Sequence, residues 1–535
     1  MVGGNKAEIS ASGQQGGQKS ASPKVSTNHN MLLKYGVLAA ILLTGLAAMG
    51  YRAGDPFGGF HGFNEGFYTL LAKRYMNLPV YRVLTSPLDF NNPPLFPILL
   101  TIAFKIFGVS EKVARGVPIL FSLLSIFFVY RLGKLIYSER SGLVAAALLA
   151  VSPAFVLVGR NVQVEAVFVF CMLSSLYYYL RSLRANDLVS AVAGGVLLGL
   201  GLISKLPIIL LPIAIVVWHL VSKRDLSWLD KRFWLYAVAA ISVGMPWYLY
   251  QIIVNRGTFL GSQTYLVGTL QAPSFLFFEM GYIGESYWAF SPVISILVMV
   301  AVIYAAIKRP GYSGLVLIAI ALNSVFYLFY HFHTYYLLPI VPLSLLLVGI
   351  MLDSFLKNTA WLAGISVGLV FISAFFMLVM LSSHKYGQDE YPQTIKMIST
   401  ATADKIALEV PDFIKGNEGP ILEYYLPGVD IRTDKEQQDF PRDEQVYWLT
   451  EPQWVGLDYT EREGVQVCTV GRVAPVIFGY RVLAAPDINL HYFNMGYLRF
   501  EKSHDIVFGL SEQRQPHMVL INWTGLAASS AKTGQ

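Results

Sequence analysis

The residues best suited to chemistry are a few charged side chains that interrupt long apolar runs. The stretch "GDPFGGFHGFNEGFY" (54–68) carries two carboxylates, Asp55 and Glu65, in an aromatic, glycine-rich setting directly after an apolar run. A carboxylate that is partly desolvated at a membrane surface can take a proton from a hydroxyl group. We therefore predict a general base here, with Glu65 as the first candidate. The alternatives are a solvated loop acid or helix cap for Glu65, and a turn residue before Pro56 for Asp55.

Basic residues follow at two further hinges between apolar runs. Arg160 and Glu165 flank the first hinge in "GRNVQVE", and Lys205 stands alone in "GLGLISKLP". The planar guanidinium of an arginine suits phosphate oxygens, and a lysine ammonium is a natural counter-charge for phosphate. The structural alternatives are a mutual ion pair of Arg160 with Glu165, and a Lys205 side chain that reaches the membrane interface as an anchor.

A histidine-rich segment, "YHFHTYY" (330–336), precedes another apolar run. His331 and His333 stand two residues apart, so an extended segment would place both rings on one side, as a metal site requires. Two histidines do not complete such a site, and His and Tyr residues such as Tyr335 are common at membrane interfaces. We assign no metal, and a divalent cation stays an alternative.

The composition is that of a membrane protein. Of 535 residues, 54% are hydrophobic and 14% are charged, whereas soluble domains carry nearer 25% charged residues. The polar residues gather at the two ends of the chain. We predict a disordered cytoplasmic tail at 1–30, a transmembrane domain at 31–381 and a soluble domain at 382–535. No dense run of Lys or Arg accompanies the net charge of +6, so nucleic acid is not an expected partner.

Apolar runs long enough to cross a bilayer number about eleven, at roughly 20 residues for each span. They lie near 32–50, 116–133, 142–158, 166–181, 188–204, 206–222, 233–253, 286–307, 313–331, 335–352 and 360–381. The run at 93–108 is short, begins with two prolines and contains Lys105. We predict that it lies as a helix at the interface, within the first outer loop.

The loops alternate in their content of Lys and Arg, which sets the orientation. With a cytoplasmic N-terminus, every inner hinge is basic, and the opposite hinges are poorer in Lys and Arg. The expected protein is thus a mainly α, multi-pass integral membrane protein of the plasma membrane, or of the ER membrane in a eukaryote. Its chemically suited residues all project from the non-cytoplasmic face. The soluble domain emerges there too, with mixed α/β character and strands in "EQVYWLT", "GVQVCTV" and "VIFGYRVLAA".

The order of these motifs resembles a known family. The acidic first outer loop is followed by "NNPPLFPILLTIAFKIFGVSEKVARGVP", "RLGKLIYSERSG", "SPAFVLVGRNVQVEAVF", "GLGLISKLP" and "HTYYLLPIVP". Over about residues 32–350 the chain is similar to the GT-C membrane glycosyltransferases. The likeness is greatest to the branch with dolichyl-phosphate-mannose protein mannosyltransferases and lipid A aminoarabinose transferases.

The resemblance implies a fold, an activity and roles for several residues. The donor would be a hexose or pentose on polyprenyl (dolichyl or undecaprenyl) phosphate, and the acceptor a hydroxyl of a glycan, protein or lipid. The displacement would invert the configuration at the anomeric carbon of the sugar, with little or no need for a metal. The family's outer-loop carboxylate corresponds to Glu65, supported by Asn64, Glu165, His333 and Tyr335. Relatives usually have Asp where Asn64 stands, which makes Asp55 the reserve base. Relatives often have Lys or His where Asn92 stands, so Lys205, Arg160 and His331 would supply the positive charge for the donor phosphate.

Two other classes of protein fit about eleven spans. One is a structural or scaffold membrane protein, which would need no set of converging ionisable residues. The other is a secondary transporter or a flippase of lipid-linked or small substrates. Transporters usually contain internal repeats and charged or broken helices near the bilayer midplane. This sequence has no convincing repeat, and its charges gather toward one face. The glycosyltransferase reading is therefore favoured.

Overall fold

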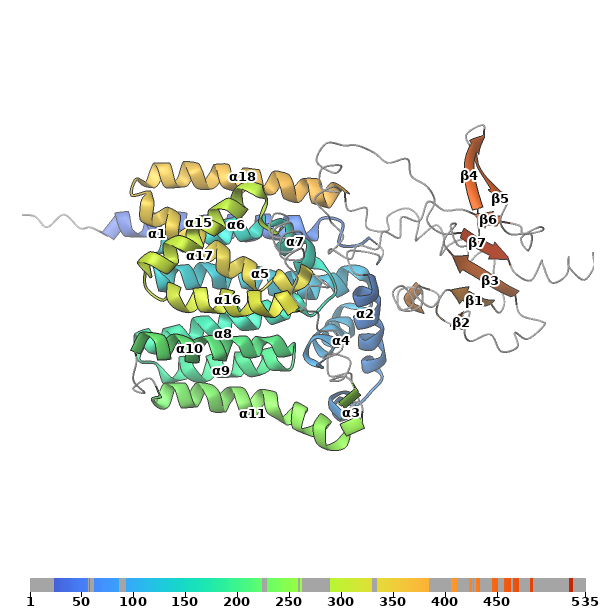
Figure 1. Ribbon diagram of the computed structural model, residues 1–535, viewed down its shortest axis with the longest axis horizontal. Coiled ribbons are helices and arrows are strands. Elements are labelled where there is room, and N and C mark those ends of the chain that lie inside the picture. The colour runs from blue at the N-terminus through green and yellow to red at the C-terminus, as the bar shows by residue number, and fades with distance from the viewer. Residues whose placement is uncertain are drawn as a thin grey trace, which may run out of the picture. The chain divides into compact units, whose positions relative to one another are not determined.

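The computed structural model describes most of the apolar part of the chain and short pieces of the C-terminal part (Figure 1). The described residues are 24–55, 57, 62–85, 93–223, 229–257, 260–261, 289–329, 334–383, 406–410, 423–425, 427, 430–433, 445–450, 457–462, 465–470, 482–484 and 519–522. The chain forms two compact units, Met1–Ala40 and Ile41–Gln535. Helix α1 (Lys24–Gly50) begins in the first unit and ends in the second.

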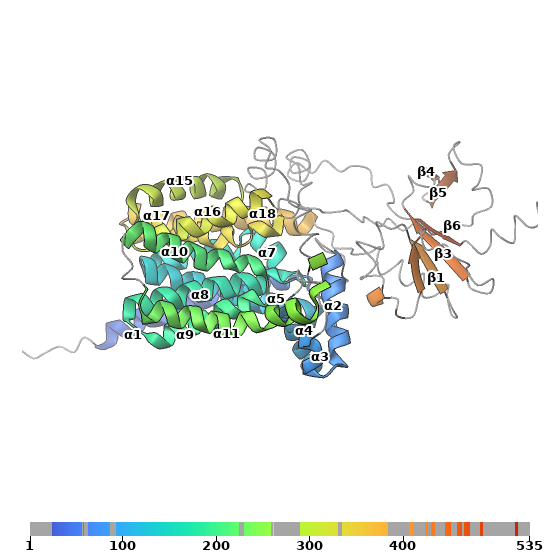
Figure 2. The same ribbon diagram turned by 60° about the horizontal axis from the view of Figure 1, so that its bottom comes forward.

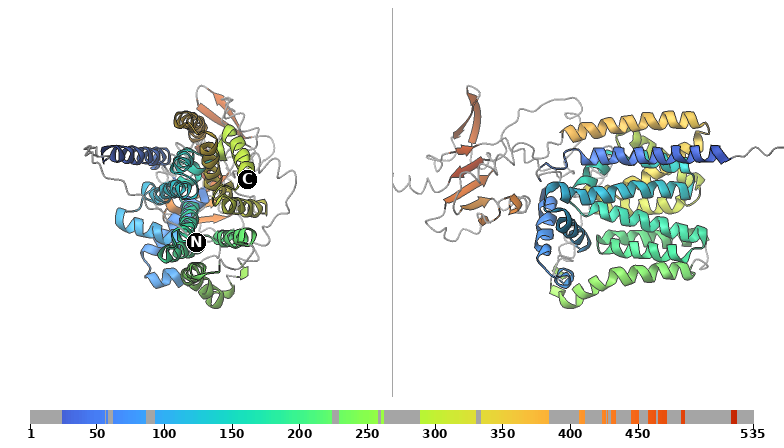
Figure 3. Two further views of the ribbon diagram at one scale, coloured as in Figure 1. Left: turned by 90° about the vertical axis from the view of Figure 1, so that its left-hand side faces the viewer. Right: turned by 180° about the vertical axis from the view of Figure 1, so that it is seen from behind.

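The apolar part of the second unit is helical. Long helices lie side by side as a bundle, and α2 runs across their direction at one end (Figure 2; Figure 3, right). The described helices of this part, besides α1, are α2 (Gly62–Met76), α3 (Val80–Thr85), α4 (Leu95–Phe107), α5 (Glu111–Ile136), α6 (Glu139–Ala150), α7 (Pro153–Arg160), α8 (Glu165–Ala185), α9 (Leu188–Leu202), α10 (Leu210–Lys223), α11 (Lys231–Val254), α15 (Pro292–Lys308), α16 (Ser313–Phe329), α17 (Ile340–Phe355) and α18 (Thr359–Ser383), with 3-10 turns η1 (Leu206–Ile209) and η3 (Thr334–Leu337).

An apolar helix occupies each segment in which the sequence predicts a span. By length and composition, four described helices suffice to cross a membrane alone, and the bent pair α6 and α7 makes a fifth candidate. The other apolar helices are shorter. The total of eleven crossings and the orientation therefore stay predictions. The expected interfacial helix is present as α4, although its depth in a bilayer is likewise a prediction.

The prediction of one continuous helix at 142–158 is wrong, because the helix is interrupted there and changes direction. Ser152 is extended, as the residue before a proline usually is, and Pro153 starts α7 at an angle of 64° to α6. The break frees backbone groups that must find new partners. The hydroxyl of Ser373 in α18 donates to the freed carbonyl of Val151 at 3.0 Å, and the Ser152 hydroxyl donates to the carbonyl of Ala289 at 2.8 Å. The second half of the pair ends at Arg160, beside the candidate site.

Small residues allow the helices to approach one another closely. A Cβ added at Gly133 in α5 would lie 2.4 Å from the Cα of Gly142 in α6. A Cβ added at Gly195 in α9 would lie 2.2 Å from the carbonyl oxygen of Tyr236 in α11. Close backbone packing of this kind is typical of helices that associate in membranes. It holds α5 against α6 and α9 against α11.

The described pieces of the C-terminal part are mostly strands. They are β1 (Ile406–Val410), β2 (Asp430–Thr433), β3 (Gln445–Thr450), β4 (Leu457–Arg462), β5 (Val465–Val470), β6 (Val482–Ala484) and β7 (Val519–Asn522). One sheet has the order β2-β1-β3-β7-β6, in which β1 pairs in parallel with β2 and β3, and β7 pairs antiparallel with β3 and β6. Strands β4 and β5 form a separate antiparallel pair. Each of the three predicted strand segments contains a strand, whereas the α/β class and the domain bounds stay predictions.

Candidate active site at one end of the bundle

The candidate site forms where α2 and α4 meet the ends of the long helices. The ring of Tyr68 in α2 packs edge-on against Phe96 in α4, with centroids 5.0 Å apart. The backbone N–H of Leu95 donates to the carbonyl of Ile203 at 3.1 Å, which ties the start of α4 to the hinge before Lys205. Residues far apart in the sequence are thereby held at one end of the molecule's helical part.

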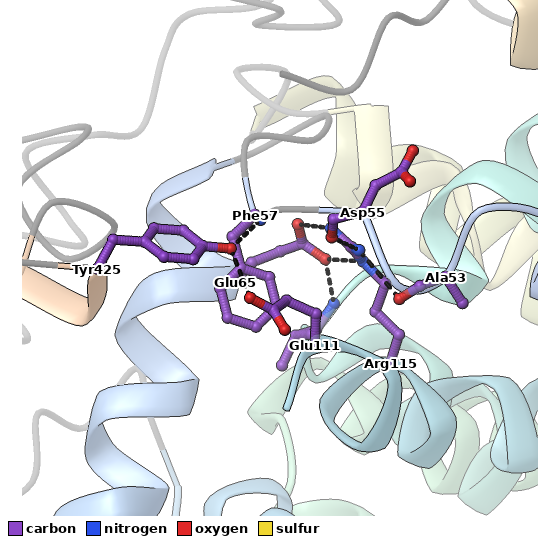
Figure 4. A network of polar contacts seen from close by, with 8 residues as sticks. Ala53, Asp55, Phe57, Glu65, Glu111, Arg115 and Tyr425 are labelled. Carbon is purple, nitrogen blue, oxygen red and sulfur yellow. Dashed lines mark hydrogen bonds and ion pairs between the residues drawn. The ribbon is translucent and has the colours of Figure 1, made fainter. Parts of the chain in front are cut away.

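Glu65 lies inside the protein as half of a buried ion pair (Figure 4). It is in the first turn of α2 rather than in a loop, and its side chain is 0% exposed. Its partner, Arg115 in α5, is 1% exposed; Nε donates to Oε1 at 2.9 Å and Nη2 donates to Oε2 at 2.8 Å. The N–H of Val162 also donates to Oε1, at 3.3 Å. From the sequence we expect a partly desolvated carboxylate in an outer loop. The structure instead has a fully buried Glu65 carboxylate, both oxygens of which accept hydrogen bonds.

Asp55 stands in a different setting, although it is close to the same arginine. Arg115 Nη1 donates to the backbone carbonyls of Ala53, at 3.1 Å, and Asp55, at 2.5 Å. The Asp55 carboxylate points away from the Glu65–Arg115 pair in Figure 4. It is 21% exposed and forms an ion pair with Arg52 at 2.6 Å. Of the two expected base candidates, Asp55 is the one with an accessible carboxylate.

The hinge between α7 and α8 (161–164) connects the start of α2 to the basic residues. The side-chain amide of Asn64 donates to Gln163 Oε1 at 3.4 Å, and Gln163 Nε2 donates to the carbonyl of Val158 at 3.4 Å. Arg160, the last residue of α7, is buried. Since Glu65 also contacts this hinge, the two neighbours Asn64 and Glu65 fix α2 against it.

Lys205 is the cation of a small pocket. Its ammonium forms an ion pair with Glu165 Oε1 at 2.5 Å, and it lies 4.6 Å and 4.3 Å from the ring centroids of Tyr335 and Tyr336. The side chain is 14% exposed. The pocket is lined by Glu165, Phe168, Lys205, Pro207, Asn323, Phe326, Tyr335, Tyr336 and Pro339. A cation flanked by aromatic rings and a carboxylate is suited to an anionic group beside apolar chains.

The structure thus brings together Glu65, Asn64 and the α7–α8 hinge, and joins Glu165, Lys205 and Tyr335 in the pocket. Lys205 forms an ion pair with Glu165, which a side chain that only reaches the membrane interface as an anchor would not do. Asn92, His331 and His333 lie outside the described residues. Within the described ranges, no three side chains of His, Cys, Asp or Glu gather closely enough to hold a metal ion.

Arg115 is the main site residue that the sequence reasoning missed. It stands in the second turn of α5, directly before the apolar run predicted at 116–133. An arginine that is buried beside such a run requires an acidic partner, which was a usable signal. The sequence alone does not identify that partner, which lies fifty residues away in Glu65.

Comparison with known proteins gives one family and several shared folds. Residues 91–250 match the family model of dolichyl-phosphate-mannose-protein mannosyltransferase. An uncharacterised protein of Aquifex aeolicus (strain VF5) is 26% identical over 208 residues, which are 37% of this chain and 40% of that one. The chain therefore matches less than half the length of that relative.

Solved structures share the fold at low identity. ArnT from Cupriavidus metallidurans bound to undecaprenyl phosphate has a TM-score of 0.59 and 13% identity, over 82% of this chain and 98% of that one. The Archaeoglobus fulgidus oligosaccharyltransferase has a TM-score of 0.55 and 15% identity, over 82% and 73%. The arabinofuranosyltransferase AftD from Mycobacteria has a TM-score of 0.51 and 14% identity, over 92% and 40%. The family match over residues 91–250 and this shared fold support the resemblance of the chain to the GT-C membrane glycosyltransferases.

Proposed function

We propose that this protein transfers a sugar from a polyprenyl-phosphate donor to a hydroxyl group of a glycan, protein or lipid acceptor. The observation that carries the proposal is the Lys205 pocket, which offers a cation and aromatic rings at the same end of the bundle as an accessible carboxylate. The solved relatives support this choice of donor, since one is described as bound to undecaprenyl phosphate and another as in complex with a dolichol-phosphate.

Lys205 is the proposed contact of the donor phosphate. In the absence of donor, Glu165 neutralises its ammonium at 2.5 Å, so an incoming phosphate competes with a carboxylate that is already in place. The donor phosphate is a diester with two non-bridging oxygens that share one negative charge, so it can accept the same charge-assisted hydrogen bonds as the carboxylate that it replaces. Arg160, Asn92 and His331 are further proposed contacts of the phosphate, carried over from the family resemblance. Tyr335 and Tyr336 supply an apolar wall for the lipid or the sugar.

Asp55 is the proposed general base, and Glu65 is a positioning residue. A base must offer a free oxygen to the acceptor hydroxyl. The carboxylate of Asp55 is partly exposed, whereas both oxygens of Glu65 accept hydrogen bonds in a closed interior. Glu65 acts through Arg115, which holds the backbone of the Asp55 loop.

The proposed reaction is a single in-line displacement with inversion at the sugar. The acceptor oxygen forms a bond to the anomeric carbon while the bond from that carbon to the phosphate oxygen breaks. Asp55 takes the proton of the hydroxyl, and the electron pair of the broken bond leaves on the polyprenyl phosphate. Negative charge grows on this leaving group, so a fixed cation such as Lys205 lowers the barrier. We place this chemistry on the non-cytoplasmic face because of the loop charges and the family resemblance.

A deletion strain tests the proposal in the cell. Mass spectrometry of its glycans and envelope lipids should find one sugar missing, and the gene for the unaltered chain should restore it. The Asp55→Asn variant, expressed to the same level in the membrane, should not restore it. An unchanged glycan and lipid profile in the deletion strain would contradict the proposed function.

A further inference from the structure

A short turn of the C-terminal part (423–425) contacts the loop that carries Asp55. The hydroxyl of Tyr425 accepts a hydrogen bond from the backbone N–H of Phe57 at 2.7 Å and donates one to Glu111 Oε1 at 2.9 Å (Figure 4). One phenol thus bridges the loop and the first turn of α5. Phenylalanine at position 425 would fill the same space and could do neither.

Aromatic rings pack beside this bridge, which is partly buried. The ring of Phe57 is fully buried, and its centroid lies 4.9 Å from that of Tyr424 and 6.1 Å from that of Tyr425. The ammonium of Lys73 in α2 lies 5.0 Å from the Tyr424 centroid. The guanidinium of Arg115 lies 5.3 Å from the Phe57 centroid. Hydrogen bonds in such a partly buried setting contribute to the stability of the loop.

Two residues on one face of α5 hold the loop from different ends. Glu111 and Arg115 are four residues apart, so their side chains project from the same side of the helix. Arg115 holds the carbonyls of Ala53 and Asp55 directly. Glu111 is linked to Phe57 through the Tyr425 hydroxyl. Among the contacts of the described residues, Arg115 therefore holds the loop at Ala53 and Asp55, and Tyr425 of the C-terminal part holds it at Phe57.

We propose that Tyr425 is a positioning residue of the transferase, through which the C-terminal part fixes the loop that carries Asp55. This inference rests on the proposed function, in which Asp55 is the base. It gives the C-terminal part a defined task in the reaction. Tyr425 does not contact the reacting atoms and acts through the backbone of Phe57.

The protonation of Tyr425 suits this bridge. Burial raises the pKa of its phenol well above the ordinary value, and the neighbouring Glu111 carboxylate raises it further, against the opposing effect of the Phe57 N–H. The hydroxyl therefore keeps its proton throughout the neutral and mildly alkaline range. It can donate to Glu111 while its oxygen accepts from Phe57.

The test uses the full chain in detergent and the variants Tyr425→Phe and Tyr424→Phe. The second is the matched control, because Tyr424 contacts Phe57 and Lys73 through its ring, which phenylalanine keeps. Hydrogen–deuterium exchange of the peptide that contains Phe57 reports the bridge without any need for activity. Loss of the hydrogen bond should speed exchange of the Phe57 amide by about tenfold in Tyr425→Phe, and leave it unchanged in Tyr424→Phe.

Kinetics then test the positioning role. Small displacements of a reacting group cost up to about 100-fold in rate, so kcat of Tyr425→Phe should fall by about 10- to 100-fold. The KM for the donor should stay within about twofold, because the Lys205 pocket is untouched. Glu111→Gln, which keeps an acceptor oxygen, should retain most of kcat. Glu111→Ala should lower kcat as Tyr425→Phe does, and the double variant should lose little more.

The outcomes separate this inference from the proposed function. Equal exchange in the unaltered chain and in Tyr425→Phe overturns the bridge, and faster exchange with unchanged kcat overturns the positioning role. If the unaltered chain consumes no polyprenyl-phosphate sugar, the proposed function fails and the positioning role fails with it. The exchange measurement then decides the Tyr425 bridge alone.

Discussion

The substitution Glu65→Gln distinguishes a positioning carboxylate from a catalytic base. Glutamine keeps the shape of the side chain and one acceptor oxygen. It removes the negative charge opposite Arg115 and turns an –NH2 group toward one of the guanidinium nitrogens, which both donate to the carboxylate in the unaltered chain. We therefore expect a loss of stability together with a loss of transfer.

The structure sets the size of the effect. Arg115 is 1% exposed and Glu65 is 0% exposed, so water cannot replace the lost partner. Removal of one member of a buried ion pair costs about 3 to 5 kcal/mol, because the other charge is left uncompensated. The loss of one or two charge-assisted hydrogen bonds, at about 1.5 to 3 kcal/mol each, gives a similar figure.

The measurement is the free energy of unfolding, obtained by titration of the purified protein from mild detergent into sodium dodecyl sulfate. Arg181→Gln is the matched control, because it breaks the exposed pair of Arg181 with Asp187, whose atoms are 3.8 Å apart. It should cost less than about 1 kcal/mol. The double variant Glu65→Met with Arg115→Met removes both charges and should be more stable than Glu65→Gln, while transfer stays lost.

One result would refute this reasoning. If Glu65→Gln unfolds at the same free energy as the unaltered chain and yet loses all transfer, the carboxylate is needed for chemistry and not for the loop. Glu65 would then be the base, and the role assigned to Asp55 would be wrong.

Three further predictions follow from the same contacts. Asp55→Asn should lower kcat by about 10²- to 10⁴-fold, as removal of a general base does. Its free energy of unfolding should change by less than about 2 kcal/mol, because the ion pair of Asp55 with Arg52 is partly exposed. An unchanged kcat would exclude Asp55 as the base. Glu165→Gln should tighten the binding of free polyprenyl phosphate by about tenfold, because it removes the carboxylate that competes for Lys205, and Lys205→Met should weaken the binding. Both affinities are measured from the ligand-induced shift in thermal unfolding. If neither affinity changes, Lys205 is not part of the phosphate site. Gly133→Ala should destabilise the protein by about 1 to 3 kcal/mol in the detergent titration, because the added Cβ would meet the backbone of α6. Gly116→Ala on the same helix is the control, because a Cβ there has open space and should not destabilise the protein. Equal losses of stability in the two variants would contradict the close packing.

The sequence predicts the positions of the helices well, because the length of an apolar run is a local signal. The segment at 93–108 is an example, since its paired prolines and short apolar run predicted a separate helix, which is α4. The break at Ser152 and Pro153 was missed, although the residue before a proline favours an extended backbone. The apolar pattern continues across the break and hides it.

The sequence singled out several residues of the candidate site, but it missed Arg115 and did not predict which side chains pair. Glu65, Glu165 and Lys205 were all identified from their placement at hinges. Their partners come from tertiary packing, which joins Glu65 to Arg115 and Glu165 to Lys205 across 50 and 40 residues. Burial of Glu65 follows from those partners, so an accessible base and a buried ion pair look alike in the sequence.

The most direct test of the central claim is a single-turnover assay with the purified full chain and labelled polyprenyl-phosphate sugars, both dolichyl and undecaprenyl. We expect that the unaltered chain consumes one of these donors and releases polyprenyl phosphate. Consumption should fall by at least about 100-fold in Asp55→Asn, while Lys205→Met should require more donor for half-maximal rate. If no donor is consumed, or if Asp55→Asn consumes it as fast as the unaltered chain, the proposed reaction or its base is wrong.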